Sequence, residues 1–309
     1  MASDVLAIVG ATATGKTEVA IEVARRLPGE VISMDSRQVY RGMDIGTAKP
    51  TPAERRGVPH FGFDLVDPDE RFNAGRFAAL ARAWIEEIRG RGHVPILAGG
   101  TGFFLRALTH PMFDEPALDA ARKESWKRYL ASLPAAEIAR WARELDRASS
   151  ARVHDRQRLC RVIEVAVLTG RPLSWWHART ESGVPPIDPL VFVLELPRDV
   201  LYRRIEARVD RMVDAGLVRE VRALMERGYD ERAPGMNATG YIELVPHVRG
   251  ELTLDEALEL IRSATRRYAR RQITWLRHQL PPGAIRLDAQ VPAPALGERI
   301  ARLWHERNT

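Results

Sequence analysis

The sequence is poor in cysteine and contains no long apolar segment. Its one cysteine, Cys160, cannot form an internal disulfide, which favours a reducing compartment. No apolar run approaches the roughly 20 residues that a membrane-spanning helix needs. The N-terminus also lacks the charged-then-apolar pattern of a signal peptide. We therefore expect a cytoplasmic protein that is not embedded in a membrane.

Lysine is the other scarce residue. Only four of the 47 basic residues are lysines, and the other 43 are arginines. The net charge of +6 permits an anionic partner such as nucleic acid without requiring one. In so arginine-rich a chain a single arginine is weak evidence. Lys16 and Lys49 lie in motif-like loops, and they indicate positions that need a compact, flexible ammonium instead of a planar guanidinium.

The first third of the chain alternates short apolar runs with segments of helical periodicity. This alternation predicts an α/β fold like that of P-loop kinases, a parallel sheet with helices on both faces. Later, a capping box at Thr253 and Glu256 predicts a long helix that ends near His278. Predicted strands cover residues 5–9, 30–34, 61–66, 94–98, 190–196 and 285–288, and predicted helices cover 16–27, 73–89 and 294–307.

A purely helical block interrupts this alternation. Residues 117–180 show helical periodicity with many charges and no strand pattern, and proline- and glycine-containing turns flank them. The sequence therefore predicts an all-helical insertion domain at residues 113–188. The two parts of the α/β core lie at residues 1–112 and 189–309.

A glycine-rich loop follows the first predicted strand and opens the first predicted helix. It fits the pattern G-x-x-x-x-G-K-[ST], whose backbone N–H groups surround phosphate oxygens. Lys16 is expected to reach the terminal phosphate, and the Thr17 hydroxyl to bind Mg²⁺. The alternative is an accidental match. The loop consists of Gly10, Ala11, Thr12, Ala13, Thr14, Gly15, Lys16 and Thr17.

The position of the nearest acid favours transfer over ATP hydrolysis. A dedicated ATPase normally carries an acid at the end of a neighbouring strand. Here the strand at 94–98 ends in Gly99-Gly100-Thr101-Gly102, without an acid, and Asp35 follows the second strand instead. At that position a carboxylate would face an acceptor across the loop, which indicates group transfer to an acceptor.

Residues 35–50, with the sequence DSRQVYRGMDIGTAKP, closely resemble a signature of the tRNA dimethylallyltransferases. Enzymes of this family transfer a dimethylallyl group from its diphosphate to N6 of an adenine next to the anticodon. The resemblance covers nearly the whole chain. It includes the phosphate loop, Gly99-Gly100-Thr101, residues 157–161, Gly240-Tyr241 and residues 265–275.

Four positions depart from the family pattern. Ala11 replaces the usual proline and Thr14 the usual serine, and both changes leave the phosphate loop possible. His154-Asp155 is more closely spaced than usual, and Ile242 stands where lysine is frequent. None of these departures falls on a residue that we expect to be catalytic.

The resemblance implies roles for three catalytic residues. Asp35 is implied as the general base that takes a proton from N6; the alternative is a turn or helix-capping aspartate. Thr101 is implied to lie near the reacting carbon or the base, and its alternative is a turn residue. Arg208, in preference to Arg211, is implied to contact the leaving diphosphate together with Mg²⁺; the alternative is a solvated helix face.

The resemblance also implies a tRNA-binding surface. Asp35, Ser36, Arg37, Gln38 and Thr101 are expected to line the pocket for the unstacked adenine, with Gln38 able to read a base edge. Trp175 and Trp176 could stack on bases, but we expect them in the core of the insertion. The anticodon stem-loop is expected to contact Arg122, Gln157, Arg158, Leu159, Cys160 and Arg161. Helical spacing separately predicts a phosphate-binding arginine stripe, for which the alternative is a solvated helix face; it consists of Arg266, Arg267, Arg270 and Arg271.

The leading hypothesis is Mg²⁺-dependent dimethylallyl transfer to tRNA by a monomer. A P-loop kinase of a small metabolite and an isopentenyltransferase of free adenine nucleotides are alternatives, but neither needs the insertion or the arginine-rich helix. A third alternative is a non-catalytic RNA-binding protein. The intact Lys16, Thr17 and Asp35 disfavour it.

Overall fold

A computed structural model describes residues 3–110, 118–153, 155–179 and 185–308. The chain forms two compact units, one made of Met1–Thr109 and Ile187–Thr309, the other of His110–Pro186. Our expected boundary between residues 112 and 113 lies outside the described residues. Among the described residues, no helix combines the length and apolar character that spanning a bilayer requires.

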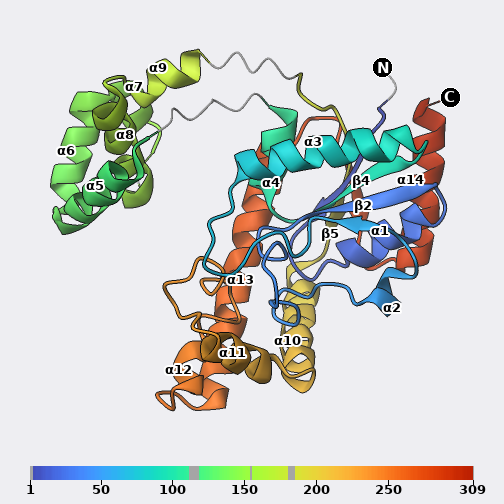
Figure 1. Cartoon of the computed structure of the whole chain (residues 1–309). Helices are drawn as coiled ribbons and strands as arrows, with labels where there is room; N and C mark the ends of the chain where they lie inside the picture. The colour runs from blue at the N-terminus through green and yellow to red at the C-terminus, as the bar shows by residue number, and fades with distance from the viewer. Residues whose placement is uncertain (1–2, 111–117, 154, 180–184, 309) are drawn as a thin grey trace. The chain divides into compact units, whose positions relative to one another are not determined.

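The first unit is built around a parallel six-stranded sheet, which confirms the predicted α/β class (Figure 1). The strand order is β3-β2-β4-β1-β5-β6. The central strands are apolar and buried on both faces, as expected where helices cover a parallel sheet. The strands are β1 (Leu6–Gly10), β2 (Gly29–Met34), β3 (His60–Phe61), β4 (Val94–Gly99), β5 (Leu190–Glu195) and β6 (Ile285–Asp288).

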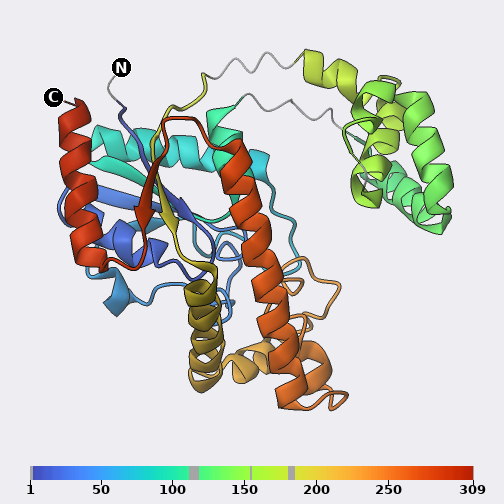
Figure 2. The same cartoon turned by 180° about the vertical axis from the view of Figure 1, so that it is seen from behind.

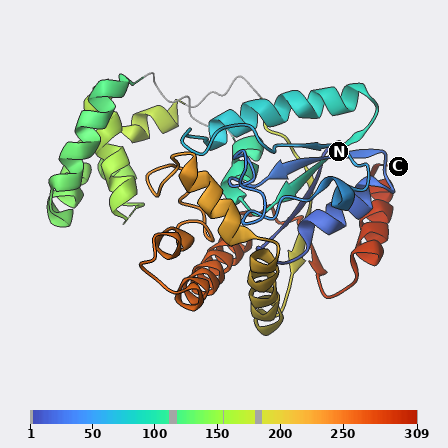
Figure 3. The same cartoon turned by 60° about the horizontal axis from the view of Figure 1, so that its bottom comes forward.

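Helices cover both faces of this sheet (Figure 3). On one face α1 (Lys16–Ala24) and α14 (Ala293–Asn308) share a hydrophobic core with β1, β4 and β5. On the other face lie α3 (Ala74–Gly90) and α4 (Gly102–Thr109), joined by the stacked rings of Phe77 and Phe104. A short helix, α2 (Pro52–Arg55), precedes β3.

A helical group extends the core beyond the carboxyl ends of the strands (Figure 2). It contains α10 (Arg198–Asp214), α11 (Leu217–Glu226), α12 (Leu244–Val248) and α13 (Leu254–Gln279). The capping box of Thr253 and Glu256 opens α13, as predicted. Its hydrophobic core includes Val39, Tyr40 and Met43, so the segment after β2 is packed onto these helices.

The predicted strand at 61–66 is wrong in extent. β3 ends at Phe61, and only an isolated bridge joins Tyr40 to Val66. The cause is local, because Gly62 and Asp64 have φ angles of 92° and 55°, outside the extended region. The chain therefore turns where apolar alternation indicated a strand.

The second unit is all-helical over its described residues. It contains α5 (Ala120–Ser132), α6 (Ala135–Leu145), α7 (Arg147–Ser150), α8 (Arg156–Thr169) and α9 (Leu173–Ala178). Its own core includes Leu130, Ile138, Val162 and Ile163. Trp176 packs against this core, while Trp175 lies under the guanidinium groups of Arg171 and Arg179.

Candidate active site

The glycine-rich loop joins β1 to α1, and hydrogen bonds from its own side chains to its backbone fix its conformation. The backbone carbonyl of Ala11 accepts hydrogen bonds from Thr14 Oγ1 at 2.9 Å and Lys16 Nζ at 2.7 Å. Gly15 has φ of 86°, a left-handed conformation that favours glycine. A Cβ on Gly10 would lie 2.7 Å from Thr14 Oγ1. The loop thus presents the N-terminus of α1 to an anion.

Two cations and one acid converge on this loop. Burial lowers the pKa of Lys16 from 10.5 to about 8; nearby Arg208 lowers it further, and the charge of Asp35 opposes the change. Arg208 Nη1 donates to Thr12 Oγ1 at 3.2 Å, and burial lowers its pKa also. Arg211 is exposed and bonds to Ala207 O in its own helix. The structure therefore places Arg208, of the two arginines, against the loop.

Asp35 and Thr101 are brought together by the register of their strands. Met34, which ends β2, is paired with Gly99, which ends β4, so the residues after them meet at one sheet edge. The Ser36 N–H donates to Thr101 Oγ1 at 3.1 Å. A Cβ on Gly99 would lie 2.2 Å from Met34 O, so this approach requires glycine.

One carboxylate oxygen of Asp35 stabilises a turn of the backbone that follows it. Its Oδ1 accepts the Arg37 N–H at 2.8 Å. The hydrogen bonds found among the described residues leave Oδ2 without a donor. One oxygen therefore fixes the local turn, and the other remains available as a proton acceptor.

Two residues of α13 complete the site, and our sequence reasoning missed both. A hydrogen bond joins Tyr268 to Thr101, and burial together with the charge of Asp35 raises the tyrosine pKa to about 12. Gln272 is buried; its Nε2 donates to Gly100 O at 2.9 Å and its Oε1 accepts the Thr12 N–H at 2.8 Å. The available signal was their spacing of four residues, which puts two polar groups on one face of an amphipathic helix.

Most of these groups line one cavity of about 1150 Å³, although Ser36, Arg37 and Thr101 are not among its lining residues. The phosphate loop, Gly99 and Gly100 form part of its wall. Asp35, Arg208 and Tyr268 also face it. The cavity therefore holds positive charge beside a carboxylate.

Gln38 does not match the prediction that it reads a base edge. It is buried, and its Oε1 accepts Ser33 Oγ at 2.7 Å. Its Nε2 donates to Thr47 O and Ala48 O, both at 3.1 Å. Because both amide hydrogens are used inside the protein, the side chain anchors the neighbouring segment instead.

In the second unit, the predicted tRNA contacts fall on α5 and α8. Arg122, Gln157 and Arg158 are exposed, and Arg161 pairs with Glu164 at 3.0 Å. Leu159 is buried in the hydrophobic core of the unit, and Cys160 packs partly buried against it. The Leu159 side chain therefore has a packing role, so the predicted contact of this residue with tRNA cannot involve its side chain. His154 lies outside the described residues.

The predicted arginine stripe lies on α13. Arg266 forms an ion pair with Glu206 at 3.1 Å, and Arg267 donates to Ser263 Oγ at 2.7 Å. Arg271 lies over the ring of Tyr268. Arg270 is exposed. The stripe is thus only partly neutralised by partners within the chain.

Mg²⁺ fits the site only as a partner of substrate phosphate. Within the described parts of the chain, no three His, Cys, Asp or Glu residues are grouped to hold a metal ion. Thr17 lies in the first turn of α1 and lines the cavity. Protein-bound Mg²⁺ commonly combines one or two protein ligands with phosphate oxygens and water, so the donor set is compatible with it.

The sequence and structure are similar to those of known transferases. The profile of the IPP transferase family matches residues 38–279, and that of the isopentenyl transferase family matches residues 3–61. The chain is 41% identical over 300 residues to a tRNA dimethylallyltransferase of Pelotomaculum thermopropionicum, covering 96% of this chain and 95% of the relative. It is 44% identical over 272 residues to one of Desulforudis audaxviator, covering 87% of each.

Solved structures give the same picture. A tRNA delta(2)-isopentenylpyrophosphate transferase of Staphylococcus epidermidis superposes with a TM-score of 0.71 at 36% identity, covering 98% of this chain and 99% of that one. A eukaryotic dimethylallyltransferase acting on tRNA superposes with a TM-score of 0.80 at 29% identity, covering 92% of this chain and 73% of that one.

Proposed function

The chain belongs to the IPP transferase family, and on this premise we propose that it transfers a dimethylallyl group from dimethylallyl diphosphate to tRNA. The acceptor is N6 of the adenine next to the anticodon, and diphosphate is released. One observation carries the proposal: the phosphate loop, Arg208 and Asp35 face a single cavity. The cavity is built from one chain, so a monomer suffices.

The leaving group is stabilised at the phosphate loop. As the bond between the allylic carbon and oxygen breaks, negative charge grows on the diphosphate. Lys16, Arg208 and the loop N–H groups oppose that charge. When bound, Mg²⁺ would supply further positive charge there, and the Thr17 hydroxyl is the protein group that would hold it.

The acceptor is activated by Asp35. An exocyclic adenine amine is a weak nucleophile, and it must lose a proton as the new nitrogen–carbon bond forms. Asp35 Oδ2 takes this proton, acting as general base. Thr101 and Ser36, tied to each other and to Tyr268, orient the amine beside it.

Arginine-rich surfaces bind the tRNA. On the helical unit these are Arg122, Gln157, Arg158 and Arg161, and on α13 they are Arg266 and Arg270. Such groups pair with phosphates without reading sequence. An anticodon-loop base is cheap to unstack, and it can therefore enter the cavity.

The proposal is tested by following a labelled dimethylallyl group. The protein is incubated with labelled dimethylallyl diphosphate, Mg²⁺ and unmodified tRNA, and separately with ATP or with free adenine nucleotides. We expect label in tRNA and release of diphosphate in equal amount. Label in free nucleotides alone, or ATP turnover with no label in tRNA, would reject it in favour of one of the two small-molecule alternatives.

A further inference from the structure

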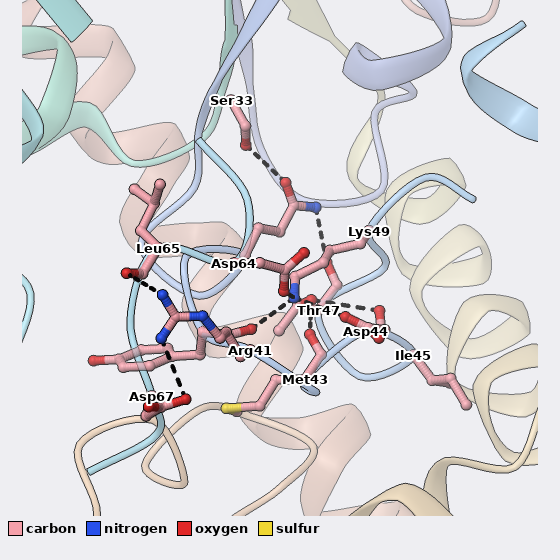
Figure 4. Close-up of polar contacts among 12 residues, drawn as sticks. Ser33, Arg41, Met43, Asp44, Ile45, Thr47, Lys49, Asp64, Leu65 and Asp67 are labelled. Atoms are coloured by element: carbon pink, nitrogen blue, oxygen red, sulfur yellow. Dashed lines mark hydrogen bonds and ion pairs between the residues drawn. The ribbon is translucent and has the colours of Figure 1, made fainter. Parts of the chain in front are cut away.

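Lys49 is a buried cation that the proposed reaction does not use. Its side chain is 4% exposed, and its ammonium group makes three hydrogen bonds (Figure 4). Nζ donates to Tyr40 O at 2.6 Å, to Asp44 Oδ1 at 2.7 Å and to Asp64 Oδ1 at 2.6 Å. All three ammonium hydrogens are therefore matched by acceptors.

These contacts join parts of the chain that surround the acceptor segment, which we define as residues 35–40. Tyr40 O ends that segment, and Asp64 lies in the turn after β3. Within it, Gln38 bonds to Ser33 and to the carbonyl oxygens of Thr47 and Ala48, which directly precede Lys49. The acceptor segment is thus held near its middle by Gln38 and at its end by Lys49, beside backbone hydrogen bonds from the N–H groups of Leu65 and Val66 to Val39 O.

We propose that Lys49 is a positioning residue for transfer: it fixes the acceptor segment, and hence Asp35, relative to the phosphate loop. The inference rests on the proposed function. Lys49 lines the same cavity, but its three ammonium hydrogens all go to acceptors in the protein, and none of these acceptors is Asp35 or the phosphate loop. Its effect on Asp35 therefore passes through the backbone of residues 35–40.

The charges explain how loss of Lys49 moves the segment. Asp44 and Asp64 both contact the same nitrogen, so without the ammonium two neighbouring carboxylates repel each other. Their side chains are 59% and 47% exposed, and water can solvate them once they separate. The expected result is that the 44–49 and 64–66 segments splay apart, and this frees Tyr40 O.

A second anchor preserves the rest of the fold. The Glu220 carboxylate accepts the N–H groups of Asp44, Ile45 and Gly46 at 3.0, 2.8 and 3.2 Å. It also accepts the hydroxyl of Tyr241, whose ring packs so closely that Gly46 has no space for a Cβ. Removal of Lys49 should therefore displace the acceptor segment without unfolding the helical group beneath it.

The test compares Lys49→Met with Arg41→Met. Arg41 directly follows the acceptor segment and bonds to Leu65 O and, at 3.3 Å, to Asp67, but its side chain is 48% exposed (Figure 4). We expect Lys49→Met to lower kcat for tRNA about 10- to 100-fold, because small misplacement of reacting groups is costly. The Kd for dimethylallyl diphosphate should stay within about twofold, and Arg41→Met should change kcat less than about threefold.

A double variant that removes the repulsion between Asp44 and Asp64 distinguishes a positioning role of Lys49 from general destabilisation of the fold. Adding Asp64→Asn to Lys49→Met removes the repulsion, so kcat should recover severalfold although no hydrogen bond to Tyr40 O returns. Equal losses of kcat and diphosphate affinity, unchanged kcat in Lys49→Met, or no recovery in the double variant would each overturn the inference. If Lys49→Met does not fold, Asp64→Asn alone must lower kcat without changing diphosphate Kd. An inactive wild-type protein would instead refute the proposed function.

Discussion

At the scale of single residues, the site depends on cations held close to one another in a half-buried place. Burial lowers the pKa of both Lys16 and Arg208. Arg208 lowers the pKa of Lys16 further, Arg211 lowers that of Arg208, and the charge of Asp35 opposes the change in each. A diphosphate relieves that repulsion when it binds. The clustered cations therefore favour binding of an anion, and without an anion they repel one another.

Arg208 and Arg211 form a matched pair for testing the diphosphate contact. They lie three residues apart on α10 and both line the cavity, but only Arg208 bonds to the phosphate loop. We expect Arg208→Met to weaken binding of dimethylallyl diphosphate about tenfold or more, since charge-assisted hydrogen bonds to it are lost. Arg211→Met should change Kd less than about threefold. Isothermal titration calorimetry measures both Kd values, and a larger effect of Arg211→Met would contradict the assignment of the diphosphate contact to Arg208.

Lys16 predicts a pH dependence of anion binding. With a pKa of about 8, its ammonium is present below that pH and lost above it. Binding of inorganic diphosphate, measured without added metal, should therefore weaken as pH rises through about 8. Lys16→Met should bind less tightly, with no such step. A wild-type profile that stays flat to pH 10 would contradict the expectation.

The same lysine has the opposite effect on stability. Its folded pKa lies below the usual 10.5, so between about 8 and 10.5 the unfolded chain binds more protons than the native one. Its contribution to the free energy of unfolding therefore rises with pH across this window.

At the scale of elements, α13 connects the two halves of the site. Through Gln272 it bonds both the phosphate loop at Thr12 and the β4–α4 turn at Gly100. Through Tyr268 it reaches Thr101. The helix thus links the phosphate loop to the turn that carries Gly100 and Thr101.

Replacing Gln272 by leucine keeps the volume and removes both hydrogen bonds. The partly buried Thr12 N–H and the buried Gly100 carbonyl lose their partners, so we expect a loss of about 1–3 kcal/mol in the free energy of unfolding. Urea denaturation measures it. The matched variant Gln279→Leu, whose side chain is exposed and pairs with Arg106, should change stability by less than about 0.5 kcal/mol. Equal effects in both variants would exclude a special role for Gln272.

The sequence predicted the features that depend on residues close together in the chain, and it did not predict those that depend on distant residues. The phosphate loop and the sheet follow from motif and periodicity within a few residues, and the fold class is confirmed. Gln38 was misjudged because its partners, the backbone carbonyls of Thr47 and Ala48, are set by tertiary structure. Gln272 was missed for the same reason, since its partners lie 172 and 260 residues away in sequence.

At the scale of the whole molecule, a net charge of +6 predicts salt-sensitive binding of tRNA. Contacts with tRNA phosphates release the counterions bound to the RNA, whereas the small diphosphate substrate binds inside a cavity and makes few such contacts. We expect the KM for tRNA to rise more steeply with salt than the Kd for dimethylallyl diphosphate. Comparable slopes for both ligands would contradict the proposed arginine surfaces.

A charge-matched pair of variants locates that surface. Arg158→Glu on α8 should raise the KM for tRNA and reduce the slope of log K against log salt by about one or more. Arg302→Glu on α14 makes the same change in net charge at an exposed residue outside the cavity lining. It should leave both quantities nearly unchanged. Equal effects would show that net charge alone controls affinity.

The central claim is that Asp35 and the phosphate loop together carry out transfer of a dimethylallyl group to an adenine amine. The most direct measurement is mass spectrometry of nucleosides from tRNA treated with dimethylallyl diphosphate and either wild-type protein or Asp35→Asn, which keeps a turn-forming oxygen. We predict an N6-dimethylallyl adenosine with wild type, and a rate at least about 100-fold lower with Asp35→Asn at equal diphosphate affinity. Unmodified tRNA with wild type, or an equal rate in the variant, would contradict the claim.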